Sequence, residues 1–174
     1  MVRTMDEGPS DEPPQRSSAS AAISLIDPDG LMAGADLAWV EQAAARAAEH
    51  LGLRGEVRVR LLDDRAMSEA HERSMGESGP TDVLTFDLDP GSGVLDVDLL
   101  VCVGEAGRRA GEFGHEVGRE VLLYIVHGVL HCLGHDDHDD ERALRMHEEE
   151  DRILRAIGVG AVYAPPARCN GESR

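Results

Sequence analysis

Several residue types are scarce or missing in this chain of 174 residues. Lysine is absent, so all 17 basic residues are arginine, and aromatic residues make up 3% of the chain. The three cysteines show no spacing typical of a disulfide framework, which favours a reduced, cytoplasmic protein. No apolar run approaches the roughly 18 residues of a membrane-spanning helix, so we expect no membrane partner. The core must be built from aliphatic side chains.

The charge balance is strongly acidic, with a formal net charge of −17. Proteins that bind nucleic acid through its phosphates normally present a basic surface. Part of the acidity is local, because nine carboxylates lie between Asp136 and Asp151. The exclusive use of arginine indicates either selection for bidentate phosphate contacts or, in the interpretation we prefer, genome-wide base composition. Charge alone therefore does not exclude an RNA substrate.

The order of polar and apolar stretches predicts one domain between two tails. Residues 1–22 are rich in Ser, Pro, Asp and Glu and lack the basic-then-apolar order of a signal peptide, so we expect a disordered tail. Residues 158–174 are expected to form a loose C-terminal tail. The domain over residues 23–157 is long enough for a sizeable core.

Within this domain, strand and helix patterns predict an α+β fold, a small mixed sheet of about four strands covered by helices. The last two strands are separated by a short Gly/Pro loop, which favours a hairpin. The helix over 116–133 is strongly apolar and is expected to be central and buried. Asp36 and either Asp63 or Asp64 are expected to cap helices. Strands are predicted over 23–26, 57–61, 83–86 and 95–103, and helices over 36–51, 64–75, 104–113, 116–133 and 139–157.

The segment 127–138 reads His-Gly-Val-Leu-His-Cys-Leu-Gly-His-Asp-Asp-His. His127 and His131 are four residues apart, so in a helix they lie on one face and their rings can close on one metal ion. Gly134 can turn the backbone out of the helix before further ligands follow. Two helical imidazoles and a third ligand leave one position open for water, as in catalytic metal sites. We therefore predict a metal site at the end of the central helix.

Three residues compete for the third ligand position. His135, Asp137 and His138 follow the first histidine of the segment by eight, ten and eleven residues. We favour His138, and we assign Asp136 or Asp137 to orienting a ring or making the turn. His147, together with Glu148–Glu150, is interpreted as part of a solvated helix face. The ion is expected to be one divalent transition metal, Zn²⁺ or alternatively Ni²⁺.

The same segment superficially resembles the zinc-peptidase signature, in which a glutamate follows the first histidine and acts as general base. Gly128 occupies that position here, which argues against a peptidase. Glycine also allows another chain segment to approach the helix closely beside the metal. We assign no catalytic side chain, and the expected catalytic group is water bound to the metal.

Two separate motifs resemble the YbeY family of bacterial metal-dependent endoribonucleases. The segment 127–138 is similar to the family's His-Gly-x-Leu-His motif with its following Gly, Asp and His. Pro80–Phe86 reads Pro-Thr-Asp-Val-Leu-Thr-Phe and is similar to the family's Pro-Thr-(Asp/Asn)-Val-Leu-Ser-Phe. The strand Asp98–Val101 and the helix Met146–Leu154 also resemble family elements, so the resemblance covers 23–157.

The resemblance implies an α+β fold with a metal in an open cleft, and hydrolysis of single-stranded RNA. It further implies work on the 3′ end of 16S ribosomal RNA and a role in ribosome quality control, with ribosomal RNA and the small ribosomal subunit as partners and no DNA. Carried over by position, His127, His131 and His138 bind the metal. Thr81 and Asp82 border the cleft.

The chain departs from the family pattern at two places that concern the site. An extra aspartate precedes His138, which therefore arrives one residue late after Gly134. Met75 stands where the family commonly has an arginine, five residues before Pro80, and Arg73 is the nearest substitute for a phosphate contact. The alternatives are a metallohydrolase of a non-RNA substrate and a ribosome assembly factor whose metal is structural.

Overall fold

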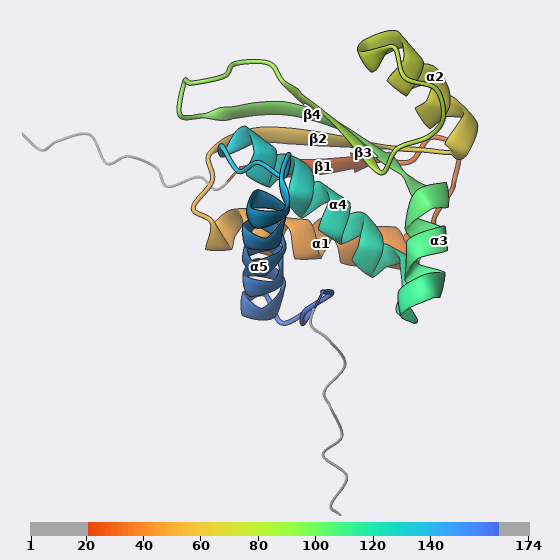
Figure 1. Ribbon diagram of the computed structural model, residues 1–174. Helices are drawn as coiled ribbons and strands as arrows, with labels where there is room; N and C mark the ends of the chain where they lie inside the picture. The colour runs from red at the N-terminus through yellow and green to blue at the C-terminus, as the bar shows by residue number, and fades with distance from the viewer. Residues whose placement is uncertain (1–20, 164–174) are drawn as a thin grey trace, which may run out of the picture.

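The structure is a computed structural model that describes residues 21–163, so the two expected tails lie largely outside the described residues. Every predicted strand and helix is present, and the expected α+β class is confirmed (Figure 1). Within residues 21–163, no helix has the length and apolar character needed to cross a membrane. The elements are β1 (Ala22–Ile26), α1 (Gly34–His50), β2 (Gly55–Leu62), α2 (Asp64–Met75), β3 (Val83–Asp87), β4 (Leu95–Cys102), α3 (Val103–Phe113), α4 (Val117–Cys132) and α5 (Asp140–Ala156).

The four strands form one mixed sheet in the order β1-β2-β4-β3. β1 and β4 both pair with β2 in parallel, whereas β3 pairs with β4 antiparallel. The expected hairpin of the last two strands is therefore confirmed. Parallel neighbours need long crossover connections, and α1 lies in the connection between β1 and β2. β3 is left at the edge of the sheet, next to the turn that contains Pro80.

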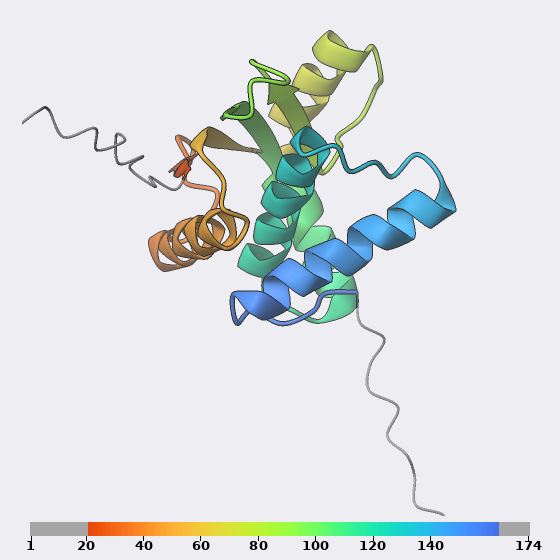
Figure 2. The same ribbon diagram turned by 90° about the vertical axis from the view of Figure 1, so that its left-hand side faces the viewer.

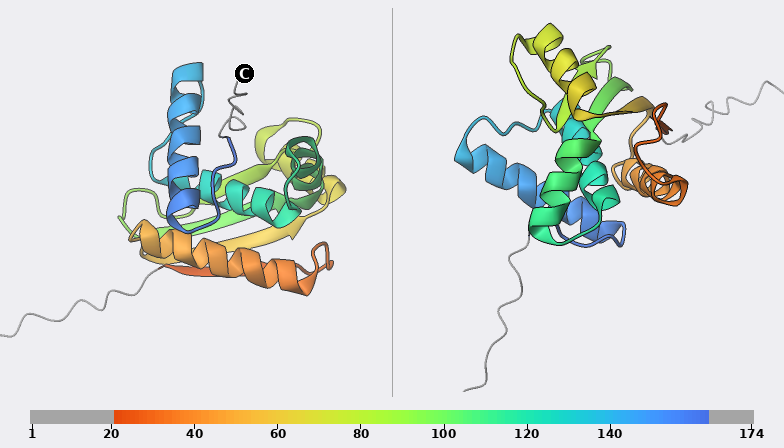
Figure 3. Two further views of the ribbon diagram at one scale, coloured as in Figure 1. Left: turned by 90° about the horizontal axis from the view of Figure 1, so that it is seen from below. Right: turned by 90° about the vertical axis from the view of Figure 1, so that its right-hand side faces the viewer.

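One face of the sheet carries the main core. Val57, Val59 and Leu61 of β2 alternate with outward residues and are completely buried. α4 packs against this face, and α1 lies beside α4 (Figure 3). The prediction that α4 is the central buried helix is thus confirmed. α5 then crosses α4, after a loop that leaves the end of α4 and extends away from the sheet (Figure 2).

Helix starts differ in how well the sequence predicted them. Asp63 caps α2 as expected, because its side chain accepts a hydrogen bond from the backbone N–H of Ala66 at 2.7 Å. The expected cap at Asp36 is wrong, since α1 begins at Gly34 without a side-chain cap. Asp36 instead lies in the first turn, where its negative charge favours the positive end of the helix dipole.

A close approach of α4 to the sheet depends on Gly128. A Cβ atom at this position would lie 2.8 Å from Thr85 Oγ1 in β3 and 2.8 Å from Leu99 Cδ2 in β4. Any larger residue would force these two side chains or the helix to shift, so the expected close approach is confirmed. The contact brings His127 next to the segment Pro80–Phe86, which joins the two motifs found in the sequence.

Candidate metal centre

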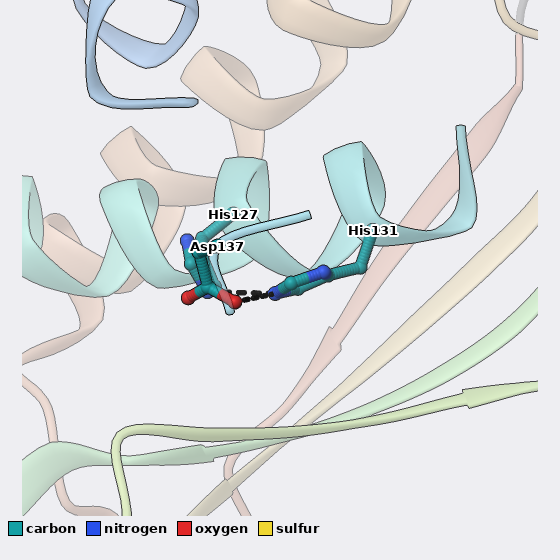
Figure 4. A group of neighbouring side chains, drawn as sticks. All are labelled: His127, His131 and Asp137. Carbon is teal, nitrogen blue, oxygen red and sulfur yellow. Dashed lines mark hydrogen bonds and ion pairs between the residues drawn. The ribbon is translucent and has the colours of Figure 1, made fainter. Parts of the chain in front are cut away.

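His127 and His131 lie one turn apart on α4, and their rings turn toward one another. Their Nε2 atoms are 3.0 Å apart. A carboxylate from the loop after α4 completes the group, because the oxygens of Asp137 lie 3.7 Å from each of these nitrogens (Figure 4). The i, i+4 spacing of a helix is therefore sufficient to bring the first two groups together, as the sequence predicted.

The other ring nitrogen of each histidine is held by an acceptor. His127 Nδ1 lies 2.7 Å from Glu150 Oε1, and His131 Nδ1 lies 3.1 Å from the backbone oxygen of His135. A carbonyl oxygen can only accept, and an ionised carboxylate likewise only accepts. Both Nδ1 atoms therefore carry a proton, and in the neutral form of the two rings the Nε2 atoms present lone pairs.

Two lone pairs that face each other at 3.0 Å repel unless a positive charge lies between them. Imidazole nitrogens and a carboxylate are the donor set that Zn²⁺ and similar transition metals prefer. The residues of this centre therefore fit a bound divalent cation. The fit rests on the two fixed Nδ1 protons as well as on the spacing of the histidines.

Glu150 is the residue that sequence reasoning missed. The prediction of a solvated face holds for the exposed Glu148, but it is wrong for Glu150, which has no solvent exposure. Burial lowers the pKa of His127, but the hydrogen bond and charge of Glu150 outweigh this and leave that pKa raised. The signal was available in the sequence, because Glu150 lies four residues after Met146 and three before Ile153, both on the buried face of α5.

The expected third ligand, His138, lies away from the histidine pair. Its side chain is 82% exposed, and its Nδ1 pairs with Asp136 Oδ1. Asp136 also accepts from Arg142, and hydrogen bonds from these two partners lower its pKa to about 2. His135 contacts His131 through its backbone oxygen and not through its ring.

A cavity of about 520 Å³ opens beside the pair, with His127 and Asp137 in its wall. The structure places Thr81 and Asp82 in the same wall. Glu120, 3% exposed, contributes a carboxylate from α4. These residues give this part of the cavity wall a polar lining with three carboxylates.

An arginine lines this cavity, but it comes from another helix than expected. Arg73 is exposed on α2, donates to the backbone oxygen of Glu69 at 3.0 Å, and does not line the cavity beside His127. Arg109 of α3 lines that cavity. Met75, at the family arginine's position, lines a second cavity of about 420 Å³ on the other side of the pair.

The close packing of α4 against the sheet also argues against a peptidase. The general base of that class would stand at Gly128, where even a Cβ atom would collide with Thr85 and Leu99. A glutamate at this position would have to displace the side chains of Thr85 and Leu99 or move α4 from the sheet.

Comparison with known proteins agrees with the motifs. The sequence model of the family described as "Endoribonuclease YbeY" matches residues 33–158. The chain is 38% identical over 127 residues to the Endoribonuclease YbeY of Moorella thermoacetica, covering 67% of this chain and 81% of that protein. It is 36% identical over 122 residues to that of Carboxydothermus hydrogenoformans, covering 69% and 85%.

A solved structure shares the fold. The solution structure of TM1509 from Thermotoga maritima superposes with a TM-score of 0.54 at 24% sequence identity, covering 79% of this chain and 88% of that chain. At this identity the likeness concerns the fold alone. The family match, by contrast, spans most of the chain and includes both motifs around the histidine pair. The chain belongs to the YbeY family of endoribonucleases.

Proposed function

We propose that this protein is a metal-dependent endoribonuclease that cleaves single-stranded RNA in the cytoplasm. Its proposed task is 3′-end maturation of 16S ribosomal RNA and ribosome quality control, with ribosomal RNA and the small ribosomal subunit as partners. Family membership supports the endoribonuclease class. The observation that carries the metal dependence is the pair of facing Nε2 lone pairs on His127 and His131, 3.0 Å apart at the edge of a polar cavity.

The proposed cofactor is one divalent transition metal, Zn²⁺ or Ni²⁺, held by His127, His131 and one side chain of the loop 134–139. The family resemblance assigns His138 to that third place. When bound, such an ion supplies Lewis acidity and lowers the pKa of water near a phosphodiester.

The chain's own residues prepare the site for this ion. The buried Glu150 accepts a hydrogen bond from Nδ1–H of His127, which leaves Nε2 of that ring free. Asp82 is fixed in the cavity wall, because its Oδ1 accepts from Thr81 Oγ1 at 3.0 Å and from the backbone N–H of Val83 at 2.8 Å. These contacts orient the ring of His127 and the carboxylate of Asp82 before substrate arrives.

The cavities favour a single strand as substrate. His127 and Asp82 belong to the walls of both the 520 Å³ and the 420 Å³ cavity, so the histidine pair lies between two open spaces. A phosphodiester at the pair would place one nucleoside on each side. We propose Arg109 as the phosphate contact, since its half-exposed guanidinium lines the cavity and pairs with the partly exposed carboxylates of Glu105 at 3.7 Å and Glu112 at 3.3 Å.

Cleavage of a single-stranded RNA oligonucleotide by metal-loaded protein tests the proposal. We expect the wild type to cleave and His131→Ala to be inactive. His50→Ala is the matched control, because His50 is an exposed histidine on α1. Equal cleavage by the wild type and His131→Ala would reject the catalytic role and favour the ribosome assembly factor with a structural metal.

A further inference from the structure

The three groups of the candidate metal centre have separations close to those that one ion requires. A tetrahedral ion with bonds of about 2.0–2.1 Å holds its ligand atoms about 3.4 Å apart. The Nε2 atoms of His127 and His131 are 3.0 Å apart, and Asp137 approaches them with both oxygens, Oδ2 at 3.7 Å from the first nitrogen and Oδ1 at 3.7 Å from the second. These separations lie on both sides of the expected value, so shifts of a few tenths of an ångström would close the group on an ion.

The end of α4 directs the loop so that Asp137 returns to the pair. Gly134 adopts a left-handed backbone with φ of 91°, and the N–H of His135 bonds to the backbone oxygen of Leu130 at 3.0 Å. This helix ending reverses the chain within one turn. Asp137 follows three residues after the glycine, and its carboxylate points at both histidine rings (Figure 4).

His138 is tied to the next element. It directly precedes Asp139, which caps α5 by accepting from the backbone N–H of Arg142 at 2.9 Å. Its ring is paired with Asp136, which Arg142 holds from the first turn of α5. Bringing the His138 ring to the pair would require breaking its contact with Asp136.

We infer that the third protein ligand of this centre is the carboxylate of Asp137 and that His138 is not a ligand. The inference rests on the proposed function, since it concerns the metal proposed there. The ligand set is then two imidazoles and one carboxylate, in place of the three histidines that the family resemblance implies. The extra aspartate of the loop thus replaces the third histidine. His138 has the separate task of tying the loop to α5.

Metal binding measured without catalysis tests this assignment. We would measure Co²⁺ and Zn²⁺ affinities by competition with a chromophoric chelator, and record the visible absorption of the Co²⁺ protein. Asp137→Ala should weaken binding more than the roughly 10–100-fold typical for loss of a residue that only orients a ligand. His138→Ala should stay within about threefold of the wild type. Asp137→His should keep the ion and change the Co²⁺ spectrum, because a nitrogen replaces an oxygen.

Both side chains are solvent-accessible, 39% for Asp137 and 82% for His138, so neither substitution is expected to unfold the domain. Thermal unfolding of the metal-free variants is the control. Loss of the ion from His138→Ala, or full retention in Asp137→Ala, would overturn the assignment while leaving the proposed function intact. If the wild type and His131→Ala bind the metal equally weakly, the proposed metal function itself fails and this inference fails with it.

Discussion

The histidine-rich segment has two halves that behave differently, the helical half 127–131 and the loop half 134–138. In the helix, backbone hydrogen bonds hold residues i and i+4 on one face, so the spacing alone brings His127 and His131 together. In the loop, a shift of one residue changes the direction in which a side chain points. Spacing is therefore a reliable guide to ligands on a helix and a poor guide to ligands on a loop.

The two halves also differ in how their side chains are supported. Both helical rings are fixed by an acceptor at Nδ1, from the buried Glu150 in one case and from a backbone oxygen in the other. The loop residues are more exposed and are held by contacts among themselves and with α5, as for Asp136 with Arg142. The helical half is therefore prepared for the proposed ion, whereas Asp137 is the loop side chain that reaches the histidine pair.

The largest contrast is expected between two histidines of the two halves. His131→Ala should lose the metal and RNA cleavage, because a ligand is removed. His135→Ala should keep both, since His135 contacts His131 through its backbone oxygen, which the substitution retains. Metal content by mass spectrometry and cleavage of a labelled oligonucleotide measure the two effects. A His135→Ala protein without metal would contradict the distinction.

Glu150→Gln should weaken metal affinity about 10–100-fold, because the residue loses the charge that supports the Nδ1 proton of His127. Glu148→Gln is the matched control, since it removes the same charge from the exposed face of α5. Titration with Zn²⁺ in the presence of a competing chelator gives both affinities. Equal affinities for the two variants would show that the buried contact does not orient the ring.

Metal removal should lower the free energy of unfolding, because the stabilisation by a bound ion grows with the logarithm of the free metal concentration. At a free metal concentration of 100 times the dissociation constant, binding stabilises the native state by about 2.7 kcal/mol. Addition of EDTA should therefore lower the unfolding temperature of the wild type. His131→Ala should unfold at the same temperature with and without EDTA. A wild-type temperature that does not respond to EDTA would contradict a metal bound to the folded state.

Gly128→Ala should destabilise the fold by about 1–3 kcal/mol, because its Cβ would collide with Thr85 and Leu99. Gly111→Ala is the control: a Cβ at this helical position meets nothing within 4 Å, and the gain in helix propensity favours stability by up to about 1 kcal/mol. Denaturant unfolding of both variants gives the comparison. Equal stability of Gly128→Ala and wild type would mean that the side chains of Thr85 and Leu99, or α4 itself, can shift at no cost.

Much of the fold could be predicted because its signals are periodic. Val57, Val59 and Leu61 alternate, which identifies a strand, and the apolar run of α4 identifies the buried helix. Asp63 was a correct cap because a polar residue stood directly before the helix, whereas α1 starts at Gly34 without any side-chain cap. The order of the strands in the sheet could not be predicted, because it depends on contacts between segments far apart in the chain.

The candidate site divides in the same way. Glu150 was misjudged because it was read with its two neighbouring glutamates instead of by its helical spacing from the buried Met146 and Ile153. The packing of α5 against α4 then decides that its carboxylate meets His127. The sequence could not place Arg109 beside the histidines, because tertiary packing brings α3 to the wall of their cavity. The phosphate contact that Arg73 was expected to supply cannot be assigned from distance along the chain.

The sequence by itself determined the helical histidine pair, the glycine beside it and the family. These features depend on local geometry, which a helix repeats every turn, and on residue types that stand in a fixed order. The tertiary structure decided which carboxylate supports His127, which cation lines the cavity and which loop residue faces the pair. Those choices depend on where α3, α5 and the loop after α4 pack, and packing is set by the whole chain.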